Sequence, residues 1–281
     1  MTETRENVYL FCFARAGAAR NLAVPGISGS DGVNTLEIGS TAAVFCSVPS
    51  GDFQGELAEK HLEDPAWVIP RACEHERVIE AVMACSPVLP VRFGSVFTSR
   101  EALSDFLAAQ QQEIAQFLDS VADKEEWGLK AFVDANKAGE QFLLSEPALA
   151  EQFARLAESP GARYFQEKRL RAEVTRHVEV WSCQIAEEIQ GELAADAVGV
   201  CPLPVLPRSF SERPDDMVLN CAVLLVSRRV ADFCNRAKTL SARLEPHGVT
   251  IELSGPWPPY SFCPTLDIRD LDEDPSLRHS P

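Results

Sequence analysis

Histidines and cysteines are the residue types that would most directly indicate catalysis or metal binding in this chain of 281 residues. The five histidines are scattered, and the pair His75-Glu76 lacks the second histidine of HExxH, which would place two zinc ligands on one helical face. The nine cysteines form no CxxC pair, and most lie in apolar runs typical of reduced, buried thiols. We therefore predict no metal site, and we interpret His75 as part of a polar helix surface.

Motifs for nucleotide binding and nucleophilic catalysis are also absent from the sequence. It contains no GxxxxGK[ST] phosphate loop and no GxSxG nucleophile elbow. The glycine-rich stretch 26–32 has the wrong spacing for a dinucleotide loop, and no strong helix pattern follows it, so we interpret it as a loop. The sequence therefore favours a protein that is not an enzyme and needs no cofactor. One alternative is a cofactor-free enzyme, which would need Glu126, His75 or Tyr260 to converge in one pocket.

The charge of the chain limits its partners. The formal net charge is −16 at pH 7, which opposes nonspecific binding to nucleic acid or anionic lipid. We therefore expect a neutral, apolar or basic partner, with no nucleic acid and no membrane. The sequence also lacks an apolar run of 18 residues and a secretory signal at its start, so we expect a cytoplasmic protein.

Arg92 and a proline-rich segment are the residues that could bind a partner. Arg92 lies between apolar neighbours in PVLPVRFGSVF, so it is expected either in a buried ion pair or as an anchor for an acidic group on a partner. In SGPWPPYSF (254–262) the prolines favour extended backbone, which would present Trp257, Tyr260 and Phe262 with little further ordering cost. These rings are expected to pack against an apolar surface, either of their own domain or of a partner.

The elements that must position these residues are read from hydrophobic periodicity. In the first half we expect a strand over 7–14, two strands that meet at Gly39 and Ser40, a helix over 73–84, an extended segment over 88–97, and a helix that begins at a capping box over 98–101. In the second half we expect a strand over 127–133, a helical region over 141–193 interrupted near 159–161, an edge strand over 198–206, a central strand over 217–226, a helix over 230–244 and a last strand over 248–253.

This order predicts an α+β protein of two domains. The second half reads strand, helix, strand, strand, helix, strand, which is the ferredoxin-like order βαββαβ. We expect a modified α+β sheet-and-helix domain over 1–122, a ferredoxin-like domain with a long helical insertion over 123–264, and an acidic flexible tail over 265–281.

Several segments resemble the gas vesicle protein L/F family of accessory proteins. The most specific are HERVIEAVMACSPVLPVRFGSVF (75–97), which is similar to the family's histidine-led helix followed by LPxRFGxxF, and GPWPPYSF (255–262), which is similar to its carboxy-terminal signature. EEWGLKAFV, GARYFQEKR and LNCAVLLVSRRVADFCNRAKTL resemble further family segments in the same order. Departures are Phe165 where leucine is common, the many cysteines, and the acidic tail.

The resemblance implies a non-enzymatic accessory protein of gas vesicles. Such a protein would bind the hydrophobic major shell protein and other accessory proteins while the vesicle nucleates and assembles, and it could be retained as a minor shell component. Arg92, Trp257 and Tyr260 are the partner-binding residues that we predict. An alternative is a small-ligand-binding regulatory module of ferredoxin-like domains, whose heat stability would shift with a metabolite.

Overall fold

The structure, a computed structural model, describes residues 6–20, 22–27, 30, 32–53, 56–156, 159–208 and 213–266. The chain divides into two compact units: the first is Met1–Lys124 with Trp257–Pro281, and the second is Glu125–Pro256. The division therefore differs from the expected boundaries, because the segment from Trp257 onward belongs with the first half. From residue 267 onward, the expected acidic tail lies outside the described residues.

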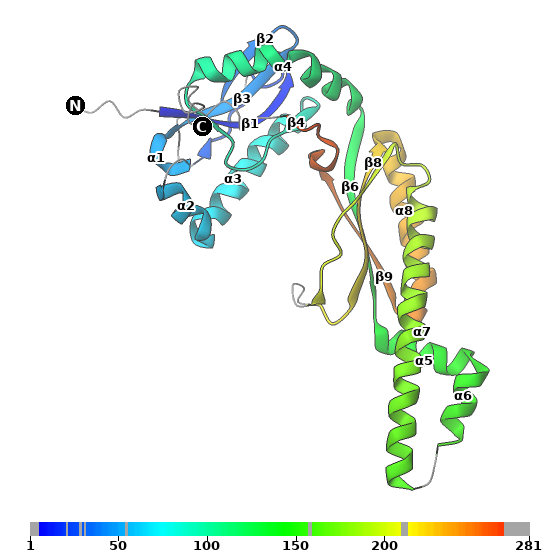
Figure 1. Ribbon diagram of the computed structural model, residues 1–281. Coiled ribbons are helices and arrows are strands. Elements are labelled where there is room, and N and C mark those ends of the chain that lie inside the picture. The colour runs from blue at the N-terminus through cyan, green and yellow to red at the C-terminus, as the bar shows by residue number, and fades with distance from the viewer. Residues whose placement is uncertain are drawn as a thin grey trace, which may run out of the picture. The chain divides into compact units, whose positions relative to one another are not determined.

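The first unit is built on a sheet in which the first strand is central (Figure 1). The strands are β1 (Glu6–Arg15), β2 (Asn34–Ile38), β3 (Thr41–Pro49), β4 (Val88–Pro90) and β5 (Val96–Phe97). Their order is β2-β3-β1-β4, and β5 also pairs with β1. The predicted tight turn between β2 and β3 is confirmed, with Gly39 at a φ of 58° that glycine adopts without steric cost.

β1 is buried on both faces of this sheet. Leu10 and Phe13 point into one core and Phe11 and Cys12 into the other, so the alternation of side chains is interrupted. The cause is a β-bulge, since the pairing with β3 shifts between Leu10 and Cys12 and leaves Phe11 as the extra residue. A strand with two apolar faces needs cover on both sides.

Helices provide this cover from both faces. The unit contains α1 (Ser50–Phe53), α2 (Glu56–Glu63), α3 (Pro65–Met83) and α4 (Arg100–Ser120). The buried side chains of α4 join the core that contains Leu10, and those of α3 join the core that contains Phe11. α3 begins well before the predicted residue 73, because Asp64 caps it by accepting a hydrogen bond from the amide of Ala66. α4 also begins differently from the prediction. A capping box over 98–101 would make residue 98 the N-cap, whereas the N-cap residue is Ser99, whose hydroxyl accepts a hydrogen bond from the amide of Ala102.

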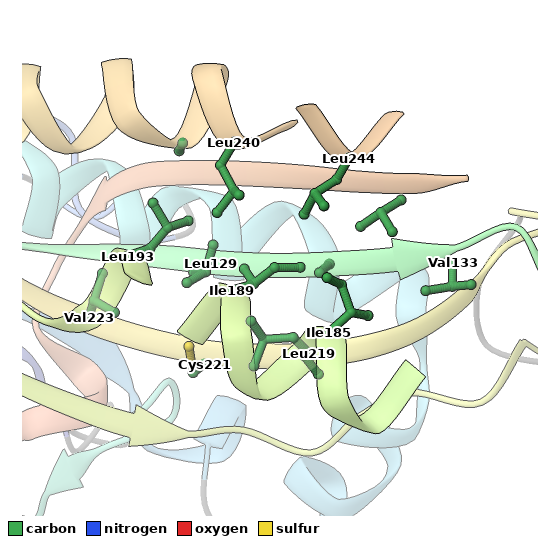
Figure 2. Close-up of a cluster of buried hydrophobic side chains, with 14 of the residues drawn as sticks. Leu129, Val133, Ile185, Ile189, Leu193, Leu219, Cys221, Val223, Leu240 and Leu244 are labelled. Atoms are coloured by element: carbon green, nitrogen blue, oxygen red, sulfur yellow. The ribbon is translucent and has the colours of Figure 1, made fainter. Parts of the chain in front are cut away.

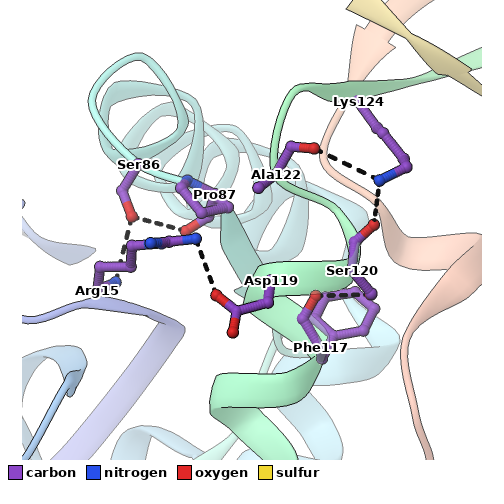
Figure 3. Close-up of polar contacts among 8 residues, drawn as sticks. All are labelled: Arg15, Ser86, Pro87, Phe117, Asp119, Ser120, Ala122 and Lys124. Atoms are coloured by element: carbon purple, nitrogen blue, oxygen red, sulfur yellow. Dashed lines mark hydrogen bonds and ion pairs between the residues drawn. The ribbon is translucent and has the colours of Figure 1, made fainter.

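Polar contacts fix the carboxyl end of α4 (Figure 3). An exposed ion pair of 2.9 Å joins Arg15 of β1 to Asp119. Beyond the helix, the Lys124 ammonium donates to the carbonyl of Ser120 at 2.6 Å, which satisfies a carbonyl of the last turn. These contacts hold the end of the helix where the chain enters the second unit.

The second unit contains a four-stranded sheet of ferredoxin-like order. Its strands are β6 (Lys124–Val133), β7 (Gly199–Pro202), β8 (Asp216–Val226) and β9 (Val249–Trp257), arranged as β7-β8-β6-β9. β7 lies at an edge and β8 is internal, as their prolines and unbroken apolar run predict. The α+β prediction with a ferredoxin-like second half is therefore confirmed.

The helices of this unit are α5 (Ala135–Ser145), α6 (Pro147–Ala154), α7 (Pro160–Ala194) and α8 (Val230–Leu244). Figure 2 shows Ile185, Ile189 and Leu193 of α7 beside Leu240 and Leu244 of α8, over the side chains of β6 and β8. The predicted interruption of the helical region near residue 160 is the start of α7, with Ser159 as N-cap residue and Pro160 in the first turn. α5 and α6 form the helical insertion before α7.

Gly255 in β9 should tolerate no side chain. Its φ is 144°, and a Cβ there would lie 3.0 Å from both the Glu126 carbonyl oxygen and a Trp127 ring carbon. We expect Gly255→Ala to lower the free energy of unfolding by about 2–3 kcal/mol, measured by urea denaturation. Gly191→Ala in the last turn of α7 is the matched control, because a Cβ there meets nothing within 4 Å. It should raise stability by up to about 1 kcal/mol, so a similar loss in both variants would contradict the assignment.

Candidate partner-binding groove

A buried hydrogen-bond network supports the turn that carries Arg92. The Nε2–H of His75 in α3 donates to the Val91 carbonyl oxygen at 3.1 Å, because a carbonyl can only accept. In the neutral ring Nδ1 then accepts from the Tyr9 hydroxyl at 2.9 Å. The Tyr9 oxygen in turn accepts from the backbone amide of Gly94 at 3.1 Å. One tyrosine and one histidine thus hold both ends of residues 91–94.

The interpretation of His75 as a polar surface residue was wrong, since its side chain is only 1% exposed. Burial lowers its pKa from the ordinary 6.5 to about 4, so the ring is neutral at pH 7. Burial raises the pKa of the Tyr9 phenol, because here too it favours the neutral form of the group. Both ring nitrogens of His75 are used in structural bonds, which leaves neither available for proton transfer.

A groove of about 750 Å³ lies outside this network, within the first unit. The turn from β4 to β5 forms one wall and the segment after Tyr260 forms the other. Its lining residues are Leu89, Pro90, Val91, Arg92, Phe93, Gly94, Ser95, Val96, Tyr260, Cys263, Pro264, Thr265 and Leu266. Among these described residues, Arg92 is the one charged side chain, although the chain as a whole has 42 acidic residues against 26 basic ones.

Arg92 is exposed and forms no ion pair with the described residues, so the expectation of a buried ion pair was wrong. The extended segment predicted over 88–97 is in fact two short strands separated by a turn. Ser95 closes this turn by donating to the Arg92 carbonyl from both its amide, at 3.2 Å, and its hydroxyl, at 2.7 Å. A turn faces solvent, so the guanidinium needs no internal carboxylate.

Tyr260 lines the same groove, and its hydroxyl is anchored. It donates a 2.6 Å hydrogen bond to the Glu76 carboxylate, while 37% of the residue remains exposed. Partial burial and the adjacent carboxylate both raise the pKa of Tyr260, and partial burial also raises the pKa of Glu76. No local pattern in the sequence indicates that Glu76, next to the buried His75, holds this ring.

The remaining predicted residue, Trp257, is 45% exposed and is not among the residues that line the groove. It ends β9, and Pro258 and Pro259 after it are buried. The proline-rich segment therefore packs against its own unit through the prolines and leaves two aromatic rings partly open to solvent. The structure thus brings Arg92 and Tyr260 together in one groove and places Trp257 at the start of the segment that leads to it.

The bond from Tyr260 to Glu76 can be tested directly. We expect Tyr260→Phe to lower the free energy of unfolding by about 1 kcal/mol, since a charge-assisted bond is lost at a partly exposed site. Tyr164→Phe is the control, because Tyr164 is 61% exposed. It should change stability by less than about 0.5 kcal/mol in the same chemical denaturation experiment. Equal effects would show that the bond contributes nothing.

Other features bear on metal binding, membrane association and catalysis. Within the described ranges, no group of three or more His, Cys, Asp or Glu side chains could hold a metal ion. No helix in the described part of the chain is long and apolar enough to cross a membrane. Glu126 is buried in β6 of the second unit, whereas His75 and Tyr260 belong to the first. A separate pocket of about 300 Å³ in the second unit is lined in part by Phe142, Trp181 and His247.

Together these features define a two-unit α+β protein with a ferredoxin-like second unit and an open, positively charged groove in the first. The family model described as "Gas vesicle synthesis protein GvpL/GvpF" matches residues 7–264. The chain therefore belongs to the GvpL/GvpF family, which comprises gas vesicle structural and assembly proteins.

Individual relatives agree with this membership. The chain is 30% identical over 250 residues to gas vesicle protein L of Streptomyces sp. (strain CB03234), covering 87% of this chain and 89% of that protein. It is 26% identical over 199 residues to gas vesicle protein L2 of Halobacterium salinarum, covering 68% and 70% of the two chains. The crystal structure of GvpF from Anabaena sp. PCC7120 has the same fold, with a TM-score of 0.67 at 17% identity over 93% of this chain and 99% of that one.

Proposed function

We propose that this protein is a non-enzymatic accessory protein of gas vesicle assembly that binds the hydrophobic major shell protein and other accessory proteins. Its role is to keep shell subunits, which expose apolar surface before they polymerise, in a form that can be added to a growing vesicle. It would act in the cytoplasm and at the gas vesicle, with retention as a minor shell component as one outcome. Membership of the family supports the gas vesicle role.

The observation that supports binding is the groove around Arg92 and Tyr260. Its lining presents polar and apolar surface in similar measure, its one charged group has no ion-pair partner among the described residues, and Trp257 offers a further partly exposed ring. Partly exposed aromatic and arginine side chains are the types that dominate binding energy at protein interfaces. We therefore assign Arg92, Tyr260 and Trp257 to partner binding. The buried bonds of Tyr9 and His75 preorganise the turn, which lowers the ordering cost of binding.

The test is co-purification of the major shell protein with this chain after co-expression. Arg92→Glu should reduce the recovered shell protein by about tenfold, the effect of losing one central interface residue. Arg77→Glu makes the same charge change at an exposed position on α3 of the same unit and should leave recovery unchanged. Melting temperatures of both variants exclude loss of folding as the cause.

Equal recovery with Arg92→Glu and wild type would remove the groove from the proposal. Recovery of no shell protein even with the wild type would remove shell binding itself. Unchanged vesicle production after deletion of the gene would contradict an essential role in assembly.

A further inference from the structure

The amino-terminal half of α7 has a charge opposite to that of the whole chain. Residues 160–176 contain five Lys or Arg residues and two glutamates, a net charge of +3, whereas the chain carries −16. Only Arg163 among these cations forms an ion pair with a described residue, Glu167, at 2.9 Å. The other cations, Lys168, Arg169, Arg171 and Arg176, are all exposed.

The stability of the helix does not account for this charge. The amino-terminal end of a helix dipole is positive, so acidic side chains stabilise the first turn and cations do not. α7 has no acidic residue in its first turn. Single exposed i,i+4 pairs of the kind formed by Arg163 contribute little to stability. Lys168, Arg169, Arg171 and Arg176 lie beyond the first turn, where the helix dipole has little effect on them. Helix stability therefore does not explain their number, and it leaves them available to a negatively charged group outside this chain.

Exposed aromatic side chains accompany the cations. Tyr164 is 61% and Phe165 71% exposed, and their rings meet edge to face with centroids 5.7 Å apart. Leu170 is the first buried side chain of α7, and from Val178 onward the buried side chains of the helix join the core of the unit. In Figure 1 this half of α7 extends beyond the strands of its own unit, beside α5 and α6.

Three of the exposed residues share one side of the helix. At 100° per residue, Phe165, Arg169 and Arg176 lie within about 40° of one another, on the side away from Leu170. Lys168 lies next to them. We call the surface formed by Phe165, Lys168, Arg169 and Arg176 the basic face of α7. It combines a large ring with three cations, which suits a ligand that has both apolar and acidic groups.

We propose that the basic face of α7 is a docking surface for an acidic segment of a partner protein that also carries apolar side chains. Charge complementarity supports this occupant, and the exposed phenylalanine provides an apolar anchor. Nucleic acid and anionic membranes are disfavoured as ligands. Each presents an extended negative surface, which would repel the net charge of −16 that the whole protein carries. This surface lies in the second unit and is independent of the groove in the first.

The experiment uses the full chain and a pair of labelled synthetic peptides. Both peptides are amphipathic with leucine on one side, and the polar side carries glutamate in one and lysine in the other. Fluorescence anisotropy should show tighter binding of the glutamate peptide, with an affinity that falls as salt is added. The double variant Arg169→Glu/Arg176→Glu should weaken binding of the glutamate peptide by about tenfold, and Phe165→Ala should weaken it as well.

The control is the double variant Arg228→Glu/Lys238→Glu, which makes the same charge change at exposed positions elsewhere in the second unit. It should reduce binding by less than about threefold, through the long-range field alone. Equal binding of the two peptides, or equal losses in the two double variants, would overturn the proposal. Vesicles of anionic lipid are the third probe, and tighter binding to them than to the glutamate peptide would overturn the assignment to a protein partner.

Discussion

His75→Ala should lower the free energy of unfolding by about 3–5 kcal/mol. The change leaves a cavity in a closely packed core and removes the acceptor of the Tyr9 hydroxyl proton and the donor to the Val91 carbonyl, both of which are buried polar groups. Because these bonds hold residues 91–94, the groove should lose its shape as well. Urea denaturation measures the first effect, and co-purification of the shell protein measures the second.

His247→Ala is the control for this variant, since His247 is an exposed histidine of the second unit. It should change stability by less than about 0.5 kcal/mol. A loss below about 1 kcal/mol in His75→Ala would show that the network contributes little. Shell protein binding that survives a large loss of stability would show that the groove does not depend on His75.

The second large effect is a loss of stability in acid. The folded pKa of His75 is about 4, below the 6.5 of an unfolded histidine, so the unfolded chain binds the proton more readily. This contribution to stability is complete above pH 6.5 and is lost as the pH falls from about 6.5 to about 4. It should amount to about 3 kcal/mol, the free-energy equivalent of the difference in pKa.

The measurement is the free energy of unfolding between pH 7 and pH 4 for the wild type and for His75→Gln. Carboxylates also titrate near pH 4, so they contribute to the change in stability at the acidic end of the range. The raised pKa of Glu76 acts in the direction opposite to His75, because it stabilises the folded state in acid. Subtracting the profile of the glutamine variant, which has no titrating group at position 75, isolates the histidine. Parallel profiles for the two proteins would contradict the assignment of a lowered pKa.

Periodicity in the sequence predicted most of the elements, and the errors concern residues whose setting depends on long-range contacts. His75 precedes Val78 and Ile79 by three and four residues, so it lies on the buried side of α3, and this spacing could have identified it. Its polar neighbours in the sequence indicated a surface instead. Its partners Tyr9 and Val91 are 66 and 16 residues away, and no local pattern indicates such contacts.

The candidate site was predicted in part, for a related reason. Arg92 and Tyr260 were selected separately, one for its apolar neighbours and the other for its proline-rich segment. Their meeting in one groove depends on the packing of residues 260–266 against the β4–β5 turn, which sequence spacing does not reveal. The exposure of Arg92 depends on a turn at residues 92–95, with Gly94 at a φ of 86°. An apolar pattern alone reads such a turn as continuous strand.

The division of the chain also sets the order in which the groove can be completed during synthesis. Trp257 and the residues after it belong to the first unit, yet the ribosome makes them only after all 132 residues of Glu125–Pro256. Domains generally fold as units while the chain emerges. The second unit is therefore fully translated before the wall that carries Tyr260 exists, and a nascent chain arrested before that point would lack one side of its groove.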